Sequence, residues 1–469
     1  MRFFIKFLTL AFFLSTPNLA ISQIGIGTQS PDASALMDIS SQNQGILTPR
    51  MTTLQREAID NPANGLLVFD TDLNAFQYYN SSLGTWEKMS SEKRNNYVLV
   101  KSQADFPMPS GGVITLDAGT YYEINGLITL SSPIDINNAY ISGLDSTEDV
   151  LSYPGGTIFQ GNNGGSIRNV TLTGGRAFNI TGSGSSNSIM LLQNCIITNM
   201  TISVGGISGI GVYFSSVIQF LNNADGITYS NIGKLLLNNQ GWFTNNAGTY
   251  ETLKGAFNQV EKIGGFSNVE GSAVGFDVSS NPTVKTGVVL SRVFSGSGIY
   301  VKGYTSGSYP GYNFTNNWTI NCPGLPEESD VRATANLYYS NSNIVVLSNN
   351  TPRKLPVTTV SARNFRTTSP ESNQVVYKGS KPRSLNIYTS ISFTAIAGMR
   401  LTFSLYKNGS QVIGTNTVYD VPQTNGRLSL PIIGTVMVDP DDKIEVWVER
   451  NTGSGGNEFL VTSYNLLVN

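Results

Sequence analysis

The residues able to carry acid–base chemistry are few. Three carboxylates, Glu261, Glu270 and Asp277, lie close together in the chain. Paired carboxylates hydrolyse glycosidic bonds, and a basic residue beside a bound sugar acid supports elimination. The basic residues nearby that could act as a base or contact a sugar are Lys254, Lys262, Lys285 and Arg292. Solvated surface charges explain the same residues, so we assign no catalytic residue and keep the three carboxylates as candidates only if the protein is an enzyme.

The chain contains no histidine, which excludes Ser-His-Asp and Cys-His catalysis and every histidine-ligated metal site. The two cysteines, Cys195 and Cys322, exclude a disulfide framework, although they could pair with each other. The simpler interpretation is two buried thiols. The run from Asp439 to Asp442 could hold calcium through carboxylate oxygens, but it also fits a turn between strands. We expect no metal ion and no cofactor.

A second candidate site is rich in aromatic residues. Flat rings suit the faces of sugars, and tyrosine and tryptophan add a polar group for hydroxyls. Glycines and prolines between these rings predict a loop, where binding residues are common. The alternative is that the rings close the open end of a core. The predicted ligand-binding residues are Tyr300, Tyr304, Tyr309, Tyr312 and Trp318.

The element that must position these residues is repetitive. From residue 155 to residue 303 the sequence consists of short apolar runs separated by glycine and asparagine, such as IRNVTLTGG and GVVLSRVFSGSG. No single run can bury its apolar side alone, but stacked rungs cover one another. The pattern therefore predicts a β-solenoid with a long, polar outer surface.

Composition narrows the class of protein further. Charged residues make up 13% of the chain and the formal net charge is −2, so nothing favours nucleic acid or an anionic membrane as a partner. The 40% hydrophobic share argues against disorder over most of the chain.

Residues 1–22 have the pattern of a secretory signal peptide. Arg2 and Lys6 precede a short apolar run, and Ala20-Ile21-Ser22 provides a small-residue cleavage site. The run is too short to span a bilayer. We therefore expect a secreted or cell-surface protein with no membrane insertion after signal removal.

Residues 23–89 form a first module, and its motifs include Ile26-Gly27-Thr28, Gly45 to Met51 and Trp86. It resembles a module near the start of many exported Bacteroidetes surface proteins and some phage fibre-like proteins. The resemblance implies a non-catalytic attachment or stem unit. Residues 90–96 are predicted to be a polar linker.

A second resemblance starts at Tyr97. The segments Ala104 to Pro107, Gly111 to Leu116 and Tyr122 to Gly126 resemble the start of right-handed β-helix domains in phage virion proteins and related bacterial proteins. This implies a right-handed parallel β-helix over residues 97–330. Prolines interrupt the following segment, and we expect residues 331–356 to be a linker.

Residues 357–469 alternate apolar and polar positions in at least six runs and contain an Asn408-Gly409 hairpin signal. This predicts an antiparallel jelly-roll sandwich. Tyr406 to Gly409 and Val438 to Val448 resemble the tumour-necrosis-factor-like or complement-type sandwich ends of phage fibres, which implies a homotrimer.

The sequence thus predicts an all-β protein: a parallel β-helix (β-solenoid) followed by an antiparallel jelly-roll sandwich, with a small N-terminal β-rich module. Our leading hypothesis is an exported, tail-spike-like or adhesin-like structural protein that recognises a cell-surface or extracellular polysaccharide. One alternative is a polysaccharide lyase or hydrolase acting on the solenoid face. Another is a purely structural shell or filament component.

Overall fold

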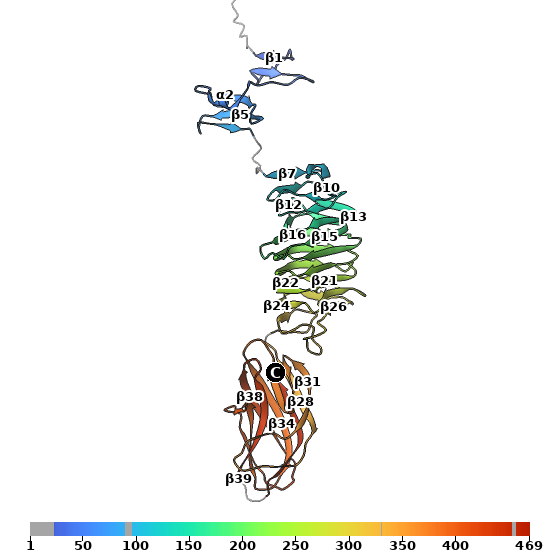
Figure 1. The fold of residues 1–469 in the computed structure, drawn as a ribbon, viewed down its shortest axis with the longest axis vertical. Helices are drawn as coiled ribbons and strands as arrows, with labels where there is room; N and C mark the ends of the chain where they lie inside the picture. Colours follow the sequence, from blue (N-terminus) through green and yellow to red (C-terminus); the bar gives the residue numbers. More distant parts are fainter. Residues whose placement is uncertain (1–22, 90–95, 330, 453–455) are drawn as a thin grey trace, which may run out of the picture. The chain divides into compact units, whose positions relative to one another are not determined.

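The computed structural model describes residues 23–89, 96–329, 331–452 and 456–469 (Figure 1). The chain divides into two compact units, Met1–Arg94 and Asn95–Asn469. The predicted signal peptide and most of the predicted linker at 90–96 lie outside the described residues. Within the described ranges no helix is both long and apolar enough to cross a membrane.

The N-terminal unit contains two small sheets. Strands β1 (Ile24–Ile26) and β2 (Met37–Ile39) pair in parallel. A four-stranded sheet follows, with the short helix α2 (Thr53–Glu57) beginning at a capping box between Thr52 and Gln55. Its strands are β3 (Arg50–Met51), β4 (Leu67–Asp70), β5 (Ala75–Asn80) and β6 (Thr85–Lys88).

The second unit begins with a parallel β-solenoid of 21 strands, β7 to β27, which confirms the predicted class of fold. The registers place the strands on three faces, which we name A, B and C. A 3-10 helix, η1 (Gln103–Asp105), follows the first strand. Right-handed winding remains a prediction.

Face A contains ten rungs, and the longer strands continue onto face B. The strands that contribute to face A are β7 (Tyr97–Val100), β9 (Tyr121–Ile124), β12 (Tyr140–Ser142), β14 (Gly165–Arg168), β16 (Ile189–Thr198), β18 (Val212–Leu221), β20 (Lys234–Trp242), β22 (Ala256–Asn268), β24 (Thr283–Leu290) and β27 (Trp318–Asn321).

Faces B and C complete each turn. Face B consists of β10 (Leu127–Thr129), the first parts of β13 (Val150–Gly161) and β15 (Thr171–Thr181), the second parts of β16, β18, β20 and β22, and β25 (Val293–Ser295). Face C consists of β8 (Ile114–Thr115), β11 (Ile134–Asp135), the second parts of β13 and β15, β17 (Ser203–Ser208), β19 (Ile227–Ser230), β21 (Thr249–Lys254), β23 (Val274–Asp277) and β26 (Ile299–Lys302).

The solenoid core is a continuous stack, because residues at the same position in successive turns lie over one another. The rings of Phe220 and Trp242 stack with centroids 3.8 Å apart, and Tyr250 continues the stack at 4.9 Å from Trp242. All three rings are buried. Each rung is therefore stabilised mainly by its neighbours.

Asparagine explains how the chain turns between faces A and B. Asn169, Asn194 and Asn239 occupy the same position in three turns with φ of 51°, 53° and 47°, a conformation that asparagine tolerates better than most residues. The amide of Asn194 also donates to Oδ1 of Asn169 at 3.2 Å. In the turn between those of Asn194 and Asn239, the equivalent residue is Val217, whose φ of 57° is unfavourable for a β-branched side chain.

The sandwich that follows has two antiparallel sheets, as predicted. One contains β28 (Thr334–Asn341), β29 (Val345–Val346), β31 (Thr358–Phe365), β34 (Arg383–Ala395), β38 (Leu428–Val438) and β40 (Glu458–Val468). The other contains β30 (Arg353–Lys354), β32 (Thr367–Thr368), β33 (Gln374–Tyr377), β35 (Arg400–Lys407), β36 (Ser410–Gln411), β37 (Thr417–Asp420) and β39 (Lys443–Thr452).

The segment 331–356 differs from the linker that we expected. It contributes β28, β29 and β30 to the sandwich, and β28 pairs with both β31 and β40. Ala335 and Leu337 on β28 are buried in the sandwich core. Pro352 and Pro356 lie outside the paired strands and therefore interrupt the segment without removing it from the sheets.

Candidate functional site

The structure does not bring the three candidate carboxylates together on one face. Glu261 lies on β22 in face A, and Asp277 lies at the end of β23 in face C. Glu270 follows β22 and accepts a hydrogen bond from the Ser297 hydroxyl at 2.6 Å. Asp277 lies 3.8 Å from the ammonium of Lys302. Glu261, Glu270 and Asp277 therefore remain candidate catalytic residues on the basis of the sequence alone.

Two of the basic residues predicted to act at the surface are instead buried. Lys262 and Arg292 lie in the solenoid core with Glu251, and all three are fully buried. The ammonium of Lys262 pairs with the Glu251 carboxylate and donates to Oε1 of Gln240 at 3.2 Å. Our prediction of sugar contacts at Lys262 and Arg292 is wrong, because their side chains point into the core.

The buried cluster is held by main-chain and side-chain oxygens. One terminal nitrogen of Arg292 donates to the Gln240 carbonyl at 3.1 Å, and the other donates to the Ser267 hydroxyl at 2.7 Å. Loss of solvation, and then the charge of Arg292, lowers the pKa of Lys262 to about 7. Charged groups in a core are stable only when they are paired, and here the contacts join neighbouring turns of the solenoid. Because the cluster is buried, it is not open to a polymer.

Two of the predicted aromatic ligands also belong to the core. The Trp318 indole donates to the Tyr304 hydroxyl at 3.1 Å, and that hydroxyl donates to the Pro282 carbonyl at 2.8 Å. Trp318 is fully buried and Tyr304 is 8% exposed. These two rings close the end of the solenoid core, so they do not present a face to a sugar.

The other three tyrosines are partly exposed. The ring of Tyr312 stacks on Phe365 of the sandwich at 4.1 Å between centroids, and Tyr309 meets the same ring edge-on at 5.7 Å. The Tyr300 hydroxyl donates to the Gly296 carbonyl at 2.8 Å. A groove of about 470 Å³ lies beside Tyr312, and its polar lining comes from Asn336, Arg363 and Asn469.

A carboxylate that the sequence did not single out fastens the loop before β27. Glu328 accepts hydrogen bonds from the backbone of Asn313 at 2.7 Å and of Phe314 at 2.9 Å. Its side chain is buried, and loss of solvation raises its pKa to about 7. Arg366 from the sandwich donates to the Trp318 carbonyl at 2.8 Å and to the Glu328 carbonyl at 3.2 Å. This group of contacts joins the solenoid to the sandwich.

The run from Asp439 to Asp442 forms the turn between β38 and β39. Asp442 accepts from Asn408 at 2.6 Å and from the backbone of Asp439 at 2.9 Å, so the turn itself uses this carboxylate. The described residues contain no cluster of three acidic, cysteine or histidine residues suited to a metal ion. Cys195 and Cys322 are free and buried, and burial raises their thiol pKa values to about 12 and about 11.

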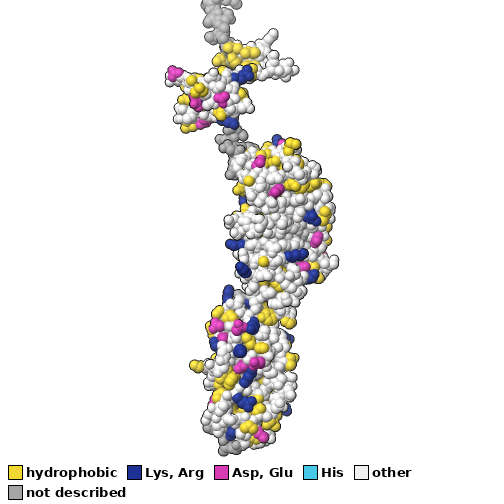
Figure 2. All heavy atoms as spheres, in the orientation of Figure 1, with side chains coloured by type: hydrophobic (Ala, Val, Ile, Leu, Met, Phe, Trp, Pro, Cys, Tyr) yellow, Lys and Arg dark blue, Asp and Glu magenta, His cyan; other side chains and the backbone are white. Residues whose placement is uncertain are grey.

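The N-terminal module has an unusual distribution of apolar side chains. Only Val68 and Ala75 are buried apolar residues among the described residues of the module. Figure 2 shows hydrophobic side chains gathered on the surface at β1 and β2. Large apolar side chains that are exposed are Ile24, Ile26, Leu36, Met37, Ile39, Ile46, Leu47, Leu54, Leu73, Phe76, Leu83 and Met89.

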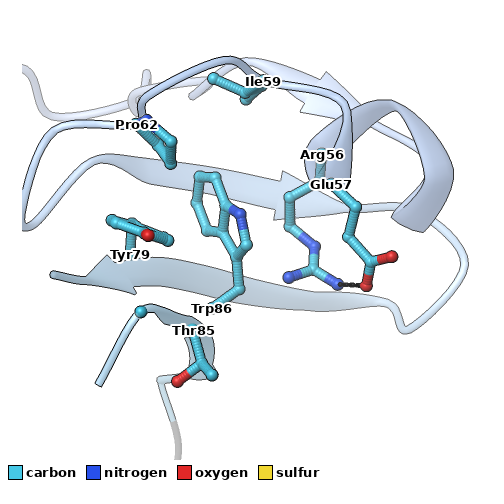
Figure 3. A pocket seen from close by; sticks show the side chains of 8 residues that line it. Arg56, Glu57, Ile59, Pro62, Tyr79, Thr85 and Trp86 are labelled. Carbon is cyan, nitrogen blue, oxygen red and sulfur yellow. Dashed lines mark hydrogen bonds and ion pairs between the residues drawn. The ribbon is translucent and has the colours of Figure 1, made fainter.

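A pocket of about 520 Å³ opens on the same module around Trp86 (Figure 3). The Trp86 ring lies between Tyr79, whose ring meets it edge-on at 5.5 Å, and the Arg56 guanidinium at 5.4 Å. Arg56 is fixed from behind by a buried ion pair with Asp70 at 2.9 Å. Pro62 and Ile59 form another wall of the pocket (Figure 3).

The module matches the family model of the phage tail-like trimerisation region over residues 25–103. The match therefore includes β1 to β7 and ends at the start of η1 in the solenoid. A search of curated proteins found no match.

Several solved structures align with parts of this chain at low identity and low TM-score. Murine APRIL at pH 8.5 is 12% identical, and the alignment covers 29% of this chain and 98% of APRIL with a TM-score of 0.21. Eiger TNF from S. frugiperda is 14% identical, with 29% and 92% covered and a TM-score of 0.21. The enzymatically active domain of bacteriophage CBA120 tailspike protein 4 is 11% identical, with 90% and 77% covered and a TM-score of 0.18.

Proposed function

We propose that the protein is an exported, tail-spike-like structural protein that forms a homotrimer and recognises a glycan at a cell surface. The observation that carries the trimer is the exposed apolar surface of residues 23–89. Large exposed apolar patches mark sites of protein contact. The match of residues 25–103 to a trimerisation region supports three copies of this chain as the partners.

Light scattering after size exclusion tests the trimer on the chain from Gln23 onward. We expect a mass near three chains, and a monomer at all concentrations would contradict the proposal. Leu36→Asp combined with Leu47→Asp should shift the protein toward monomer, because each leucine loses about 1.5–3 kcal/mol of burial. Ile413→Asp is the matched control, since Ile413 is 97% exposed in the sandwich and lies outside the matched region.

The glycan part of the proposal rests on the groove beside Tyr312. A partly exposed tyrosine ring, two asparagine side chains and the exposed Arg363 line it, and this mixture suits sugar rings and hydroxyls. Tyr312→Ala should weaken glycan binding about fivefold or more, since a ring contact contributes about 1 kcal/mol or more. Tyr338→Ala, on an exposed tyrosine of β28, should leave binding unchanged.

A glycan array screened with the intact protein supplies the probes for that test. Binding that is insensitive to Tyr312→Ala would overturn the site. An array on which nothing binds, together with ordered self-assembly, would support a purely structural component instead.

A further inference from the structure

One outward position of face A forms a largely apolar ladder with one residue per turn. Tyr97 and Tyr121 pair in the first two strands, and their rings stack with centroids 6.0 Å apart. Every later rung adds one side chain at the same position. The members of the face A ladder are Tyr97, Tyr121, Tyr140, Ser166, Leu191, Phe214, Leu236, Glu261, Val288 and Thr319.

The positions beside the ladder carry polar side chains in several turns and apolar ones in others, namely Ile189 and Val212 on one side and Ile263 and Leu290 on the other. On one side, the register places Lys234, Gln259 and Thr286 next to Leu236, Glu261 and Val288. On the other side are Gln193, Ser216 and Asn238. Glu261 is the charged member of the ladder, and it accepts a hydrogen bond from Gln259 at 3.2 Å. Apolar and aromatic side chains with polar ones among them are the usual composition of a protein–protein contact.

Face C provides an internal comparison, because it belongs to the same solenoid and has the same strand spacing. At one outward position of face C the residues are polar in every turn for which the register is given, apart from a glycine, although the exposed Ile299 lies at another position of that face. They are Gln160, Asn179, Gly206, Thr228, Thr252, Asp277 and Lys302. Contact with solvent thus explains the polar side chains at this position of face C, but it does not explain the apolar side chains of the ladder on face A.

The ladder is continuous in sequence with the region matched to trimerisation. That region, residues 25–103, contains all of β7, and Tyr97 on β7 is the first member of the ladder. A contact between copies that begins at β7 can therefore continue along face A, rung by rung. The ladder combines the aliphatic Leu191, Leu236 and Val288 with aromatic side chains, and such a mixture is typical of a contact between protein chains.

We infer that face A is the surface on which the solenoids of neighbouring copies of this chain pack. This inference rests on the proposed trimer and specifies which face of the solenoid the trimer buries. Face C then remains open to solvent in the assembly. The partner is a second copy of the same chain, contacting the ladder and the positions beside it.

Thiol labelling of two matched variants tests this in the full chain from Gln23 onward. Leu236→Cys places a thiol on the ladder, and Thr228→Cys places one at a half-buried position on face C. Maleimide labelling is followed by peptide mass, which separates these sites from the buried Cys195 and Cys322. In the trimer we expect labelling of Leu236→Cys to be at least about tenfold slower than that of Thr228→Cys, because labelling then needs local opening or dissociation.

The outcomes separate this inference from the proposed trimer. If the mass is that of a trimer and both thiols react at similar rates, face A is open and the inference is overturned while the trimer stands. If the wild-type chain is a monomer, the proposed trimer is overturned, and the inference that rests on it is overturned with it. Slow labelling of Leu236→Cys in such a monomer would mean that another part of the same chain covers face A. As a second measurement, Phe214→Glu should lower the trimer fraction while Thr228→Glu should not, with circular dichroism reporting that both variants fold.

Discussion

The solenoid and the N-terminal module bury apolar side chains in different ways. In the solenoid, successive turns of the same chain cover one another, and even a Lys262–Glu251 ion pair is sealed inside. In residues 23–89, two apolar residues are buried while twelve large ones remain exposed. The solenoid therefore has a core of its own, whereas the module needs surfaces from elsewhere to cover its apolar residues.

This difference separates two roles within one protein. A region with its own core can supply length and surface without a partner. A region whose apolar residues are exposed in the single chain is expected to gain stability from association, so its stability should depend on protein concentration.

The largest effect is expected inside the solenoid core. Lys262→Met removes the cation that pairs directly with Glu251 and leaves Arg292 as the cation that remains in the cluster, which should lower the free energy of unfolding by about 3–5 kcal/mol. Adding Glu251→Leu should recover only part of that loss, because Arg292 then lacks the nearby carboxylate whose charge favours its protonated form. Denaturant unfolding measures both variants, with the exposed Lys285→Met as the control. A loss for Lys262→Met as small as that of the control would mean that the pair is not sealed in the core.

The next effect concerns the join between solenoid and sandwich. The pKa of Glu328 is about 7 in the folded chain, above its usual 4.5, so the folded state binds the extra proton between these values. Stability should therefore be highest below pH 4.5 with respect to this group and fall as pH rises toward 7, by at most about 3 kcal/mol. Calorimetry from pH 4.5 to pH 7 measures the slope. Glu328→Gln should flatten it, and an unchanged slope would assign the pH dependence to another group.

Dilution should affect the two regions differently. Near the concentration at which the trimer dissociates, we expect protease cleavage in residues 23–89 to become about tenfold faster, while cleavage in the solenoid stays constant. Fragment masses from one digest report both regions, so each chain is its own control. Equal protection of the module at every concentration would show that it is stable without partners.

The smallest effect is expected at Val217, where a valine adopts the left-handed conformation that asparagine adopts in neighbouring turns. Val217→Asn should stabilise the protein by about 1 kcal/mol, because asparagine tolerates this conformation. Val217→Ala is the control, since alanine keeps most of the backbone penalty. Equal melting temperatures for the two variants would mean that the backbone strain is negligible.

The order of strands was predictable from the sequence because glycine and asparagine mark each turn. The runs around Asn194 and Asn239 alternate clearly enough to predict a stacked solenoid. The sandwich was predictable from alternation such as Ile444-Val446-Val448, although β28 was missed because prolines surround it. Pairing across more than a hundred residues, as between β28 and β40, leaves no local signal.

The position of single charged residues was less predictable. Lys262 and Glu261 are neighbours in the chain, but one points into the core and the other belongs to the face A ladder. The side that a strand residue faces depends on register, and a shift of one residue reverses it. A lysine is also rarely buried, so the sequence alone favours the surface for Lys262. Leu191, Phe214 and Leu236 are brought to one position of face A by the register of the strands, which the sequence alone does not give.

The repeated register has a consequence for how such a protein can change its length in evolution. Leu191, Phe214 and Leu236 occupy the same position in three successive turns. Deleting residues 214–235 would therefore bring Leu236 to the place of Phe214 and leave each later side chain on its original face. Whole turns can be gained or lost as units while both ends of the solenoid are conserved, so the spacing between its two flanking regions can be adjusted in discrete steps.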